Sequence, residues 1–81
     1  MKPRIEDLRK VESAWRRFRQ SAEQLGRSGS QCSVYELLHF MSPPSIPAGR
    51  VIQAARSLGL QVDVFERAPC QLQNYVIRSG L

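Results

Sequence analysis

The fold of this chain is decided by residues 33–64, which read SVYELLHFMSPPSIPAGRVIQAARSLGLQVDV. Ser33 and Glu36 have the spacing of a capping box, in which the serine hydroxyl accepts from the glutamate amide and the glutamate side chain reaches back. This spacing predicts a short helix over about residues 33–41. Two consecutive prolines, beginning at Pro43, end that helix, because proline donates no backbone hydrogen bond and disfavours helical geometry in the residue before it.

A second helix and a β-hairpin are predicted to follow. Ser45 is the expected N-cap of a helix over about residues 46–58, and Gly59 suits the left-handed position that ends a helix. Alternating apolar and polar residues then predict a strand over about residues 60–66. A run of β-branched and aromatic residues predicts its partner strand over about residues 71–78.

The longest predicted helix covers about residues 3–25, and Gly26 follows it as the expected left-handed C′ residue. Its apolar residues recur at spacings of three and four, the a/d pattern of a helix that packs along one face. Such a stripe belongs either to the core or to a seam between two copies of the chain. A chain this short has little surface with which to cover it, which favours a homodimer. The stripe consists of Leu8, Val11, Trp15, Phe18, Ala22 and Leu25.

The chain is strongly basic. It holds 12 Lys and Arg residues against 7 Asp and Glu residues, which gives a net charge of +5 at pH 7 and a pI near 10.0. Ten of the cations are arginines, whose planar guanidinium makes bidentate contacts to phosphates and base edges. Residues 1–31 hold eight cations and four anions, whereas residues 32–81 hold four and three. An Arg-rich composition is equally typical of a soluble protein from a genome of high GC content.

The order of a capped short helix, a turn, a second helix ending in Leu-Gly-Leu and a two-stranded hairpin resembles the winged helix-turn-helix family. The resemblance covers residues 32–78, and the preceding helix corresponds to the family's first, supporting helix. It implies one α+β domain over residues 1–81, with three helices followed by a β-hairpin wing. In that family the second helix of the pair enters the major groove of DNA, and the hairpin lies along the neighbouring phosphates.

The resemblance also implies which side chains touch DNA. Arginine and glutamine side chains on a reading helix recognise guanine and adenine edges. The implied base contacts are Arg50, Gln53, Arg56 and Ser57, and the implied phosphate contact at the hairpin tip is Arg67.

Further phosphate contacts are predicted on the N-terminal helix, where cations recur seven residues apart on the side away from the apolar stripe. Such a row could neutralise several phosphates. The alternative is a solvated helix face with local ion pairs such as Glu12–Arg16. The predicted set is Arg9, Lys10, Arg16 and Arg17.

The sequence offers few residues from which a disulfide framework, a metal site or a catalytic site could be built. Cys32 and Cys70 form neither a disulfide framework nor a metal site by themselves. Cys32, Glu36 and His39 could share one side of a helix, but a metal site needs more ligands than these, so no metal and no cofactor are expected. With one histidine, no phosphate loop and no nucleophile elbow, the chain is not expected to be an enzyme. No apolar leader or membrane span is read, so a cytoplasmic protein with reduced thiols is expected.

The leading hypothesis is a small sequence-specific DNA-binding protein, a dimeric transcriptional regulator that binds double-stranded DNA. One alternative is a protein-interaction module, such as a phage- or plasmid-encoded modulator that binds another protein through its N-terminal helix and winged-helix surface. A third is a basic RNA-binding protein, but this sequence lacks the paired aromatic residues of an RNA-recognition sheet. The stretch over residues 33–64 supports the fold, whereas the charge that favours nucleic acid lies mostly outside it.

Overall fold

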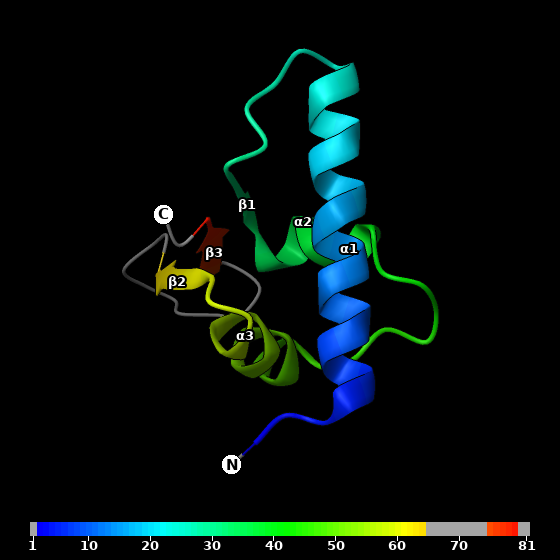
Figure 1. The fold of residues 1–81 in the computed structure, drawn as a ribbon, viewed down its shortest axis with the longest axis vertical. Helices are drawn as coiled ribbons and strands as arrows, with labels where there is room; N and C mark the ends of the chain where they lie inside the picture. Colours follow the sequence, from blue (N-terminus) through cyan, green and yellow to red (C-terminus); the bar gives the residue numbers. More distant parts are fainter. Residues whose placement is uncertain (1, 65–74, 80–81) are drawn as a thin grey trace.

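The computed structural model describes residues 2–64 and 75–79, in which three helices pack beside a small sheet (Figure 1). α1 stands along the longest axis of the molecule, and α3 and the sheet lie to one side of it (Figure 1). The elements in chain order are α1 (Ile5–Gln24), β1 (Gln31–Ser33), α2 (Val34–His39), α3 (Ala48–Ser57), β2 (Gln61–Val64) and β3 (Tyr75–Arg78).

The expected α+β class is correct, but the expected order of three helices followed by a hairpin is not. β1 lies between α1 and α2, and the sheet has the antiparallel order β1-β3-β2. Cys32 pairs with Ile77, so β1 adds a third strand to the hairpin. Three residues are too few to show the alternation that reveals a strand, and their pairing partner lies far along the chain. The sequence around β1 therefore reads as a linker.

β3 is the central strand and carries the deepest side chain of the sheet. Ile77 lies opposite Cys32 on one side and Val62 on the other, and its side chain is fully buried. The predicted strand residues 65–66 and 71–74, together with Arg67 and Cys70, lie outside the described residues.

The apolar stripe of α1 packs against α2 and α3 within one chain. Val11, Trp15, Phe18 and Ala22 are buried, and Leu8 packs against them while partly exposed. The sixth stripe residue is different, because Leu25 is 67% exposed. α1 ends at Gln24, and its last turn extends beyond the sheet and the other helices, which leaves Leu25 at the end of the stripe exposed (Figure 1).

Glycine ends both long helices in the way the sequence predicts. Gly26 has φ 69° and Gly59 has φ 87°, the left-handed conformation that costs glycine little. Arg27 N donates to Ala22 O at 2.7 Å, and Leu60 N donates to Ala55 O at 3.0 Å. These six-to-one hydrogen bonds are those of the Schellman motif, and they reverse the chain after each helix.

The start of α2 follows prediction and the start of α3 does not. Ser33 Oγ accepts a hydrogen bond from Glu36 N at 3.0 Å, which is the serine half of the predicted capping box. The Glu36 carboxylate instead faces Arg27, with Oε2 at 3.7 Å from Nη2. α3 begins at Ala48 with Pro47 as its N-cap residue, and no side chain caps it, so Ser45 as N-cap was wrong. Ile46 is buried in the core, and its anchoring leaves the chain extended up to Pro47.

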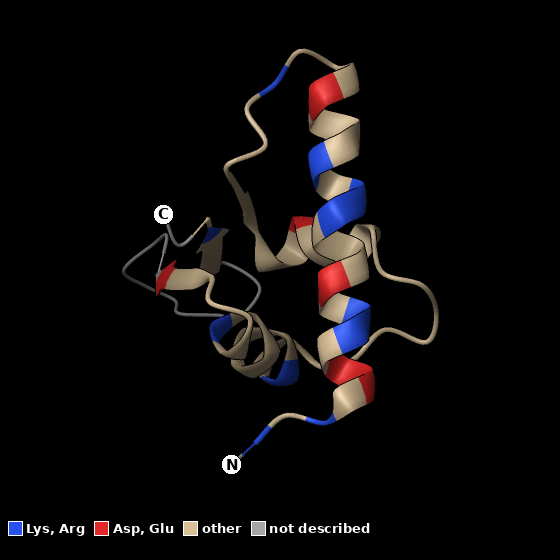
Figure 2. Cartoon of the chain, viewed as in Figure 1, with Lys and Arg blue, Asp and Glu red and all other residues tan. Residues whose placement is uncertain are grey.

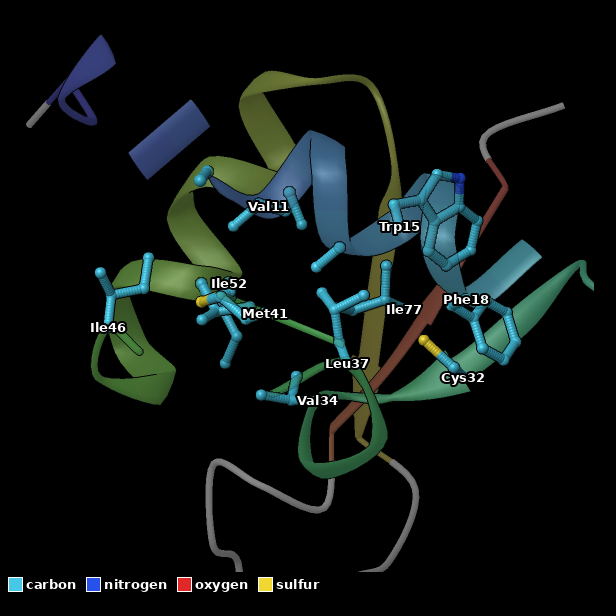
Figure 3. Close-up of a cluster of buried hydrophobic side chains, with 14 of the residues drawn as sticks. Val11, Trp15, Phe18, Cys32, Val34, Leu37, Met41, Ile46, Ile52 and Ile77 are labelled. Carbon is cyan, nitrogen blue, oxygen red and sulfur yellow. The ribbon is translucent and has the colours of Figure 1, made fainter. Parts of the chain in front are cut away.

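One core joins all the elements (Figure 3). Side chains of α1, α2 and α3 meet those of the sheet in the middle of the molecule, and Leu37 and Ile77 are the largest that are fully buried. Ala14 of α1 is also fully buried, although it lies outside the predicted stripe. Across the described part of the chain, the helices are too short or too polar to cross a lipid bilayer.

The Ser33 cap gives a test of the helix-turn-helix half. Ser33→Ala is expected to lower the free energy of unfolding by about 1 kcal/mol, because the Glu36 amide loses its acceptor. Ser45→Ala is the matched control, since Ser45 is exposed and caps nothing, and it should change stability by less than about 0.5 kcal/mol. Urea unfolding followed by circular dichroism measures both variants. Equal losses would show that the cap contributes nothing of its own.

Candidate nucleic-acid interface

α3 has one buried and one exposed side. Val51, Ile52, Ala54 and Ala55 enter the core. Gln53, Arg56 and Ser57, which the resemblance implied as base contacts, are all exposed. The structure thus brings three of the four implied residues to the same helix surface, as the spacing of the buried residues requires.

Arg50, the fourth implied base contact, is engaged inside the protein. Its Nε donates to Asp7 Oδ2 at 2.9 Å and its Nη2 donates to Asp7 Oδ1 at 2.7 Å. The Asp7 residue is 2% exposed, whereas the Arg50 side chain is 38% exposed. This bidentate salt bridge joins the first turn of α1 to the first turn of α3, so it helps to fix the orientation of α3 relative to α1.

The pair also sets the charge state of both groups. The hydrogen bond from Arg50 holds the pKa of the Asp7 carboxyl below its ordinary value, against the opposing effect of burial. The same hydrogen bond raises the pKa of the Arg50 guanidinium. Both groups are therefore charged at neutral pH.

Sequence reasoning overlooked Asp7 as a structural residue. An acidic residue near the start of a helix is commonly assigned to the positive end of the helix dipole, and Glu6 beside it is exposed as that reading requires. The signal that could have identified Asp7 is its spacing. It lies four residues before Val11, on the same side of α1 as the buried stripe.

The four cations predicted as phosphate contacts on α1 do not form one row. Arg9 and Arg16 are exposed on the side opposite the buried stripe, and Arg16 Nη2 lies 3.5 Å from Glu12 Oε1. Lys10 and Arg17 instead lie on the flank that faces the connection between α2 and α3. Figure 2 shows cations along the length of α1, with acidic residues between them.

Lys10 and Arg17 hold the α2–α3 connection against α1. Lys10 Nζ donates to the carbonyl oxygen of Ser42 at 3.3 Å and also to that of Pro44. Arg17 Nη1 donates to Ser42 Oγ at 3.1 Å. Because these bonds cross from α1 to the segment that leads into α3, the cations position that segment as well as contributing charge.

Two cations that the sequence analysis did not select precede α1. Lys2 and Arg4 are both exposed, and Arg4 is the N-cap residue of α1, three residues before Asp7. Since Asp7 is bonded to Arg50, this N-terminal segment starts beside the first turn of α3. It therefore brings positive charge to the end of α3 that carries Arg50.

The described part of the hairpin adds little positive charge. Arg78 Nη2 donates to Asp63 Oδ2 across β2 and β3, so this cation is paired within the sheet. Arg67, the implied phosphate contact at the hairpin tip, lies outside the described residues.

Cys32 does not share a helix face with Glu36 and His39, because it lies in β1 and its side chain is buried. Burial, and secondarily the charge of Glu36, raises the pKa of the Cys32 thiol to about 12. A thiol with this pKa stays protonated at neutral pH and reacts slowly. Within residues 2–64 and 75–79, no three His, Cys, Asp or Glu side chains gather as metal ligands do.

The candidate interface thus consists of an exposed α3 surface, a cationic segment before α1, and cations of α1 that contact the α2–α3 connection. Comparisons of the chain's sequence and structure with family models, curated proteins and solved structures give no match.

Proposed function

We propose that this protein binds double-stranded DNA as a winged helix-turn-helix module and acts as a sequence-specific transcriptional regulator. The observation that carries the proposal is the surface of α3, where Gln53, Arg56 and Ser57 are exposed while the opposite side is buried. A helix whose apolar side is packed in the core and whose polar side is exposed to solvent can enter the major groove.

The arrangement of the other elements supports the same proposal. α2 and α3 form a helix pair joined by residues 40–47, and β2 and β3 follow α3 as a wing would. In this proposal β1 is a third strand that fastens the wing to the helices. The net charge of +5 favours association with a polyanion.

The proposed footprint differs from the one that the resemblance implied. Gln53, Arg56 and Ser57 are the base-contacting candidates, and the exposed Lys2 and Arg4 before α1 are candidates for phosphate contacts. Arg50 becomes a positioning residue that orients α3 through Asp7.

Arg56→Gln provides the test. Duplexes that the protein binds are first selected from a random library, and the affinity for the best duplex is then compared with that for an unselected one by fluorescence anisotropy. Loss of a base contact is expected to cost about 1–3 kcal/mol on the selected duplex and less on the unselected one.

Arg19→Gln is the matched control, because Arg19 is exposed on α1 and the substitution removes the same charge. It should weaken binding to both duplexes slightly and equally. If Arg56→Gln also weakened binding to both equally, α3 would not read bases.

A second candidate function is favoured by the pairing of cations within the fold. Arg50 is bonded to Asp7 and Arg78 to Asp63, so two cations of α3 and the described hairpin are already paired. A winged-helix surface with so little free charge also suits a protein-interaction module. Failure of the protein to bind any duplex at low and high salt would favour this function over DNA binding.

We also propose a homodimer, but the apolar stripe of α1 no longer serves as its expected contact surface. The stripe that was expected at a dimer seam is buried within one chain, apart from Leu25 and part of Leu8. A dimer would therefore use another surface, and sedimentation equilibrium would measure its formation.

A further inference from the structure

We infer that the junction between α1 and the α2–α3 connection is a binding site for a phosphate group, and that a backbone phosphate of DNA occupies it. The identity of the occupant rests on the proposed function, whereas the site itself rests on the geometry below.

The site is a small open cleft of about 200 Å³ lined by Arg9, Lys10, Ser13 and Ser42. Three of these residues come from neighbouring turns of α1, and Ser42 comes from the connection. Arg17, one turn further along α1, donates from Nη1 to Ser42 Oγ at 3.1 Å. The fold thus gathers three cations and two hydroxyl groups at one place.

These groups keep hydrogen-bond donors for a ligand. The Lys10 ammonium has three donors and directs two at the carbonyl oxygens of Ser42 and Pro44. Arg17 uses one of its five donors on Ser42. Arg9 is exposed and forms no ion pair with any residue that the structure describes. A phosphate diester offers only acceptor oxygens, which complement a site built from donors.

The charge of the cleft is not cancelled by its surroundings. Two nearby carboxylates are paired elsewhere, Asp7 with Arg50 and Glu12 with Arg16. Glu6, one turn before Lys10, is a single anion against three cations. The cleft therefore attracts an anion.

The bonds across the junction also prepare the site. Lys10 and Arg17 are long side chains that lose rotamer freedom when they bind a ligand, and here their contacts to Ser42 already restrict them. The connection leads into α3 from the other side of α1 (Figure 1), so a phosphate held beside Ser42 would be bound on the flank of α1, across that helix from α3. Such a contact would fix the position of the protein on DNA without reading sequence.

The test compares Arg9→Gln with Arg16→Gln, because both substitutions remove one exposed charge from the same helix and only Arg9 lines the cleft. Duplex affinity is measured over a series of salt concentrations. Arg9→Gln is expected to reduce the slope of log affinity against log salt by about one and to weaken all duplexes by a similar factor, on the order of fivefold at low salt. Arg16→Gln should leave the slope near that of the wild type.

A second measurement uses inorganic phosphate and does not depend on DNA. Titration into the ¹⁵N-labelled protein should shift the amide signals of Arg9, Ser13 and Ser42, and Arg9→Gln should reduce these shifts. Chloride at equal ionic strength is the control and should leave the signals in place.

The outcomes separate the inference from the proposed function. An unchanged salt slope for Arg9→Gln, in a protein whose duplex binding is weakened by Arg56→Gln, would overturn the inference and leave the function standing. Phosphate-induced shifts in a protein that binds no duplex would support the site but overturn both DNA as its occupant and the proposed function. Absence of phosphate-induced shifts at Arg9 and Ser42 would overturn the site.

Discussion

Arg50→Gln is expected to lower the thermal midpoint of unfolding by about 10 °C. The substitution leaves the Asp7 carboxylate buried without its counter-ion, which is costlier than the loss of an exposed ion pair. It also removes two bonds that join the first turns of α1 and α3. Differential scanning calorimetry at neutral pH measures the change.

Arg56→Gln is the matched control for this prediction, since it removes the same charge from the same helix at an exposed position. Its midpoint should stay within about 3 °C of the wild type. The double variant Asp7→Asn/Arg50→Gln should recover part of the loss, because neither partner is then left charged in the protein. A double variant less stable than Arg50→Gln alone would show that the pair does not account for the effect.

The Asp7–Arg50 pair also predicts how stability depends on pH. The pKa of the Asp7 carboxyl is lower in the folded chain than its ordinary value of 3.8. Its contribution is therefore fully present above pH 3.8 and is lost as the pH falls through the folded pKa. The Asp7→Asn variant lacks this part of the acid dependence, whereas Glu6→Gln, at an exposed neighbour, should retain it.

Ile77→Ala is expected to lower the free energy of unfolding by about 2–5 kcal/mol, because it opens a cavity under the central strand. Ile77 is fully buried and lies between Cys32 and Val62 in the sheet. Urea unfolding measures the loss. Ile77→Val, expected to cost about 0.5–1.5 kcal/mol, gives a measurable value if the alanine variant does not fold.

Val76→Ala is the control on the same strand. Val76 follows the alternation of β3 onto the other side of the sheet and is only partly buried. It should therefore lose clearly less stability than Ile77→Ala. Losses of equal size would mean that the core does not lie on the Ile77 side of the sheet.

These two residues show why stability and the candidate interface are linked. Ile77 fastens β1 and the hairpin to the core, and Arg50 fastens α3 to α1. Variants of either residue are thus expected to weaken DNA binding through the placement of α3, with no contact to the ligand. For this reason the tests of binding above use Arg56, Arg9 and their matched controls.

The part of the candidate site that could be predicted is the part that depends on helical period. The spacing of Val51, Ile52 and Ala55 places Gln53 and Arg56 on the other side of α3 wherever α3 lies. The helical period also predicted an exposed Arg50, because this period contains no information about a partner on another helix. Only the packing of α1 against α3 brings Asp7 within 2.7 Å of it, 43 residues away in the sequence.

Local interactions explain what the sequence by itself determined. The cap at Ser33, the left-handed glycines after α1 and α3, and the apolar stripe of α1 depend on residues within about one or two helical turns of each other. These signals can therefore be recognised without knowledge of any distant contact. They are sufficient to predict the three helices to within about two residues, and the alternation after Gly59 adds the strands that make the chain α+β.

The tertiary structure decided what depends on distant partners. β1 exists because Cys32 meets Ile77, α3 begins at Ala48 because Ile46 is anchored in the core, and the cleft beside Ser42 exists because Lys10 reaches the α2–α3 connection. In each case the energy comes from a hydrogen bond or a buried surface that forms only when segments far apart in the chain meet. No local pattern encodes such a contact, so the sheet order and the cleft proposed to bind phosphate are visible only in the folded chain.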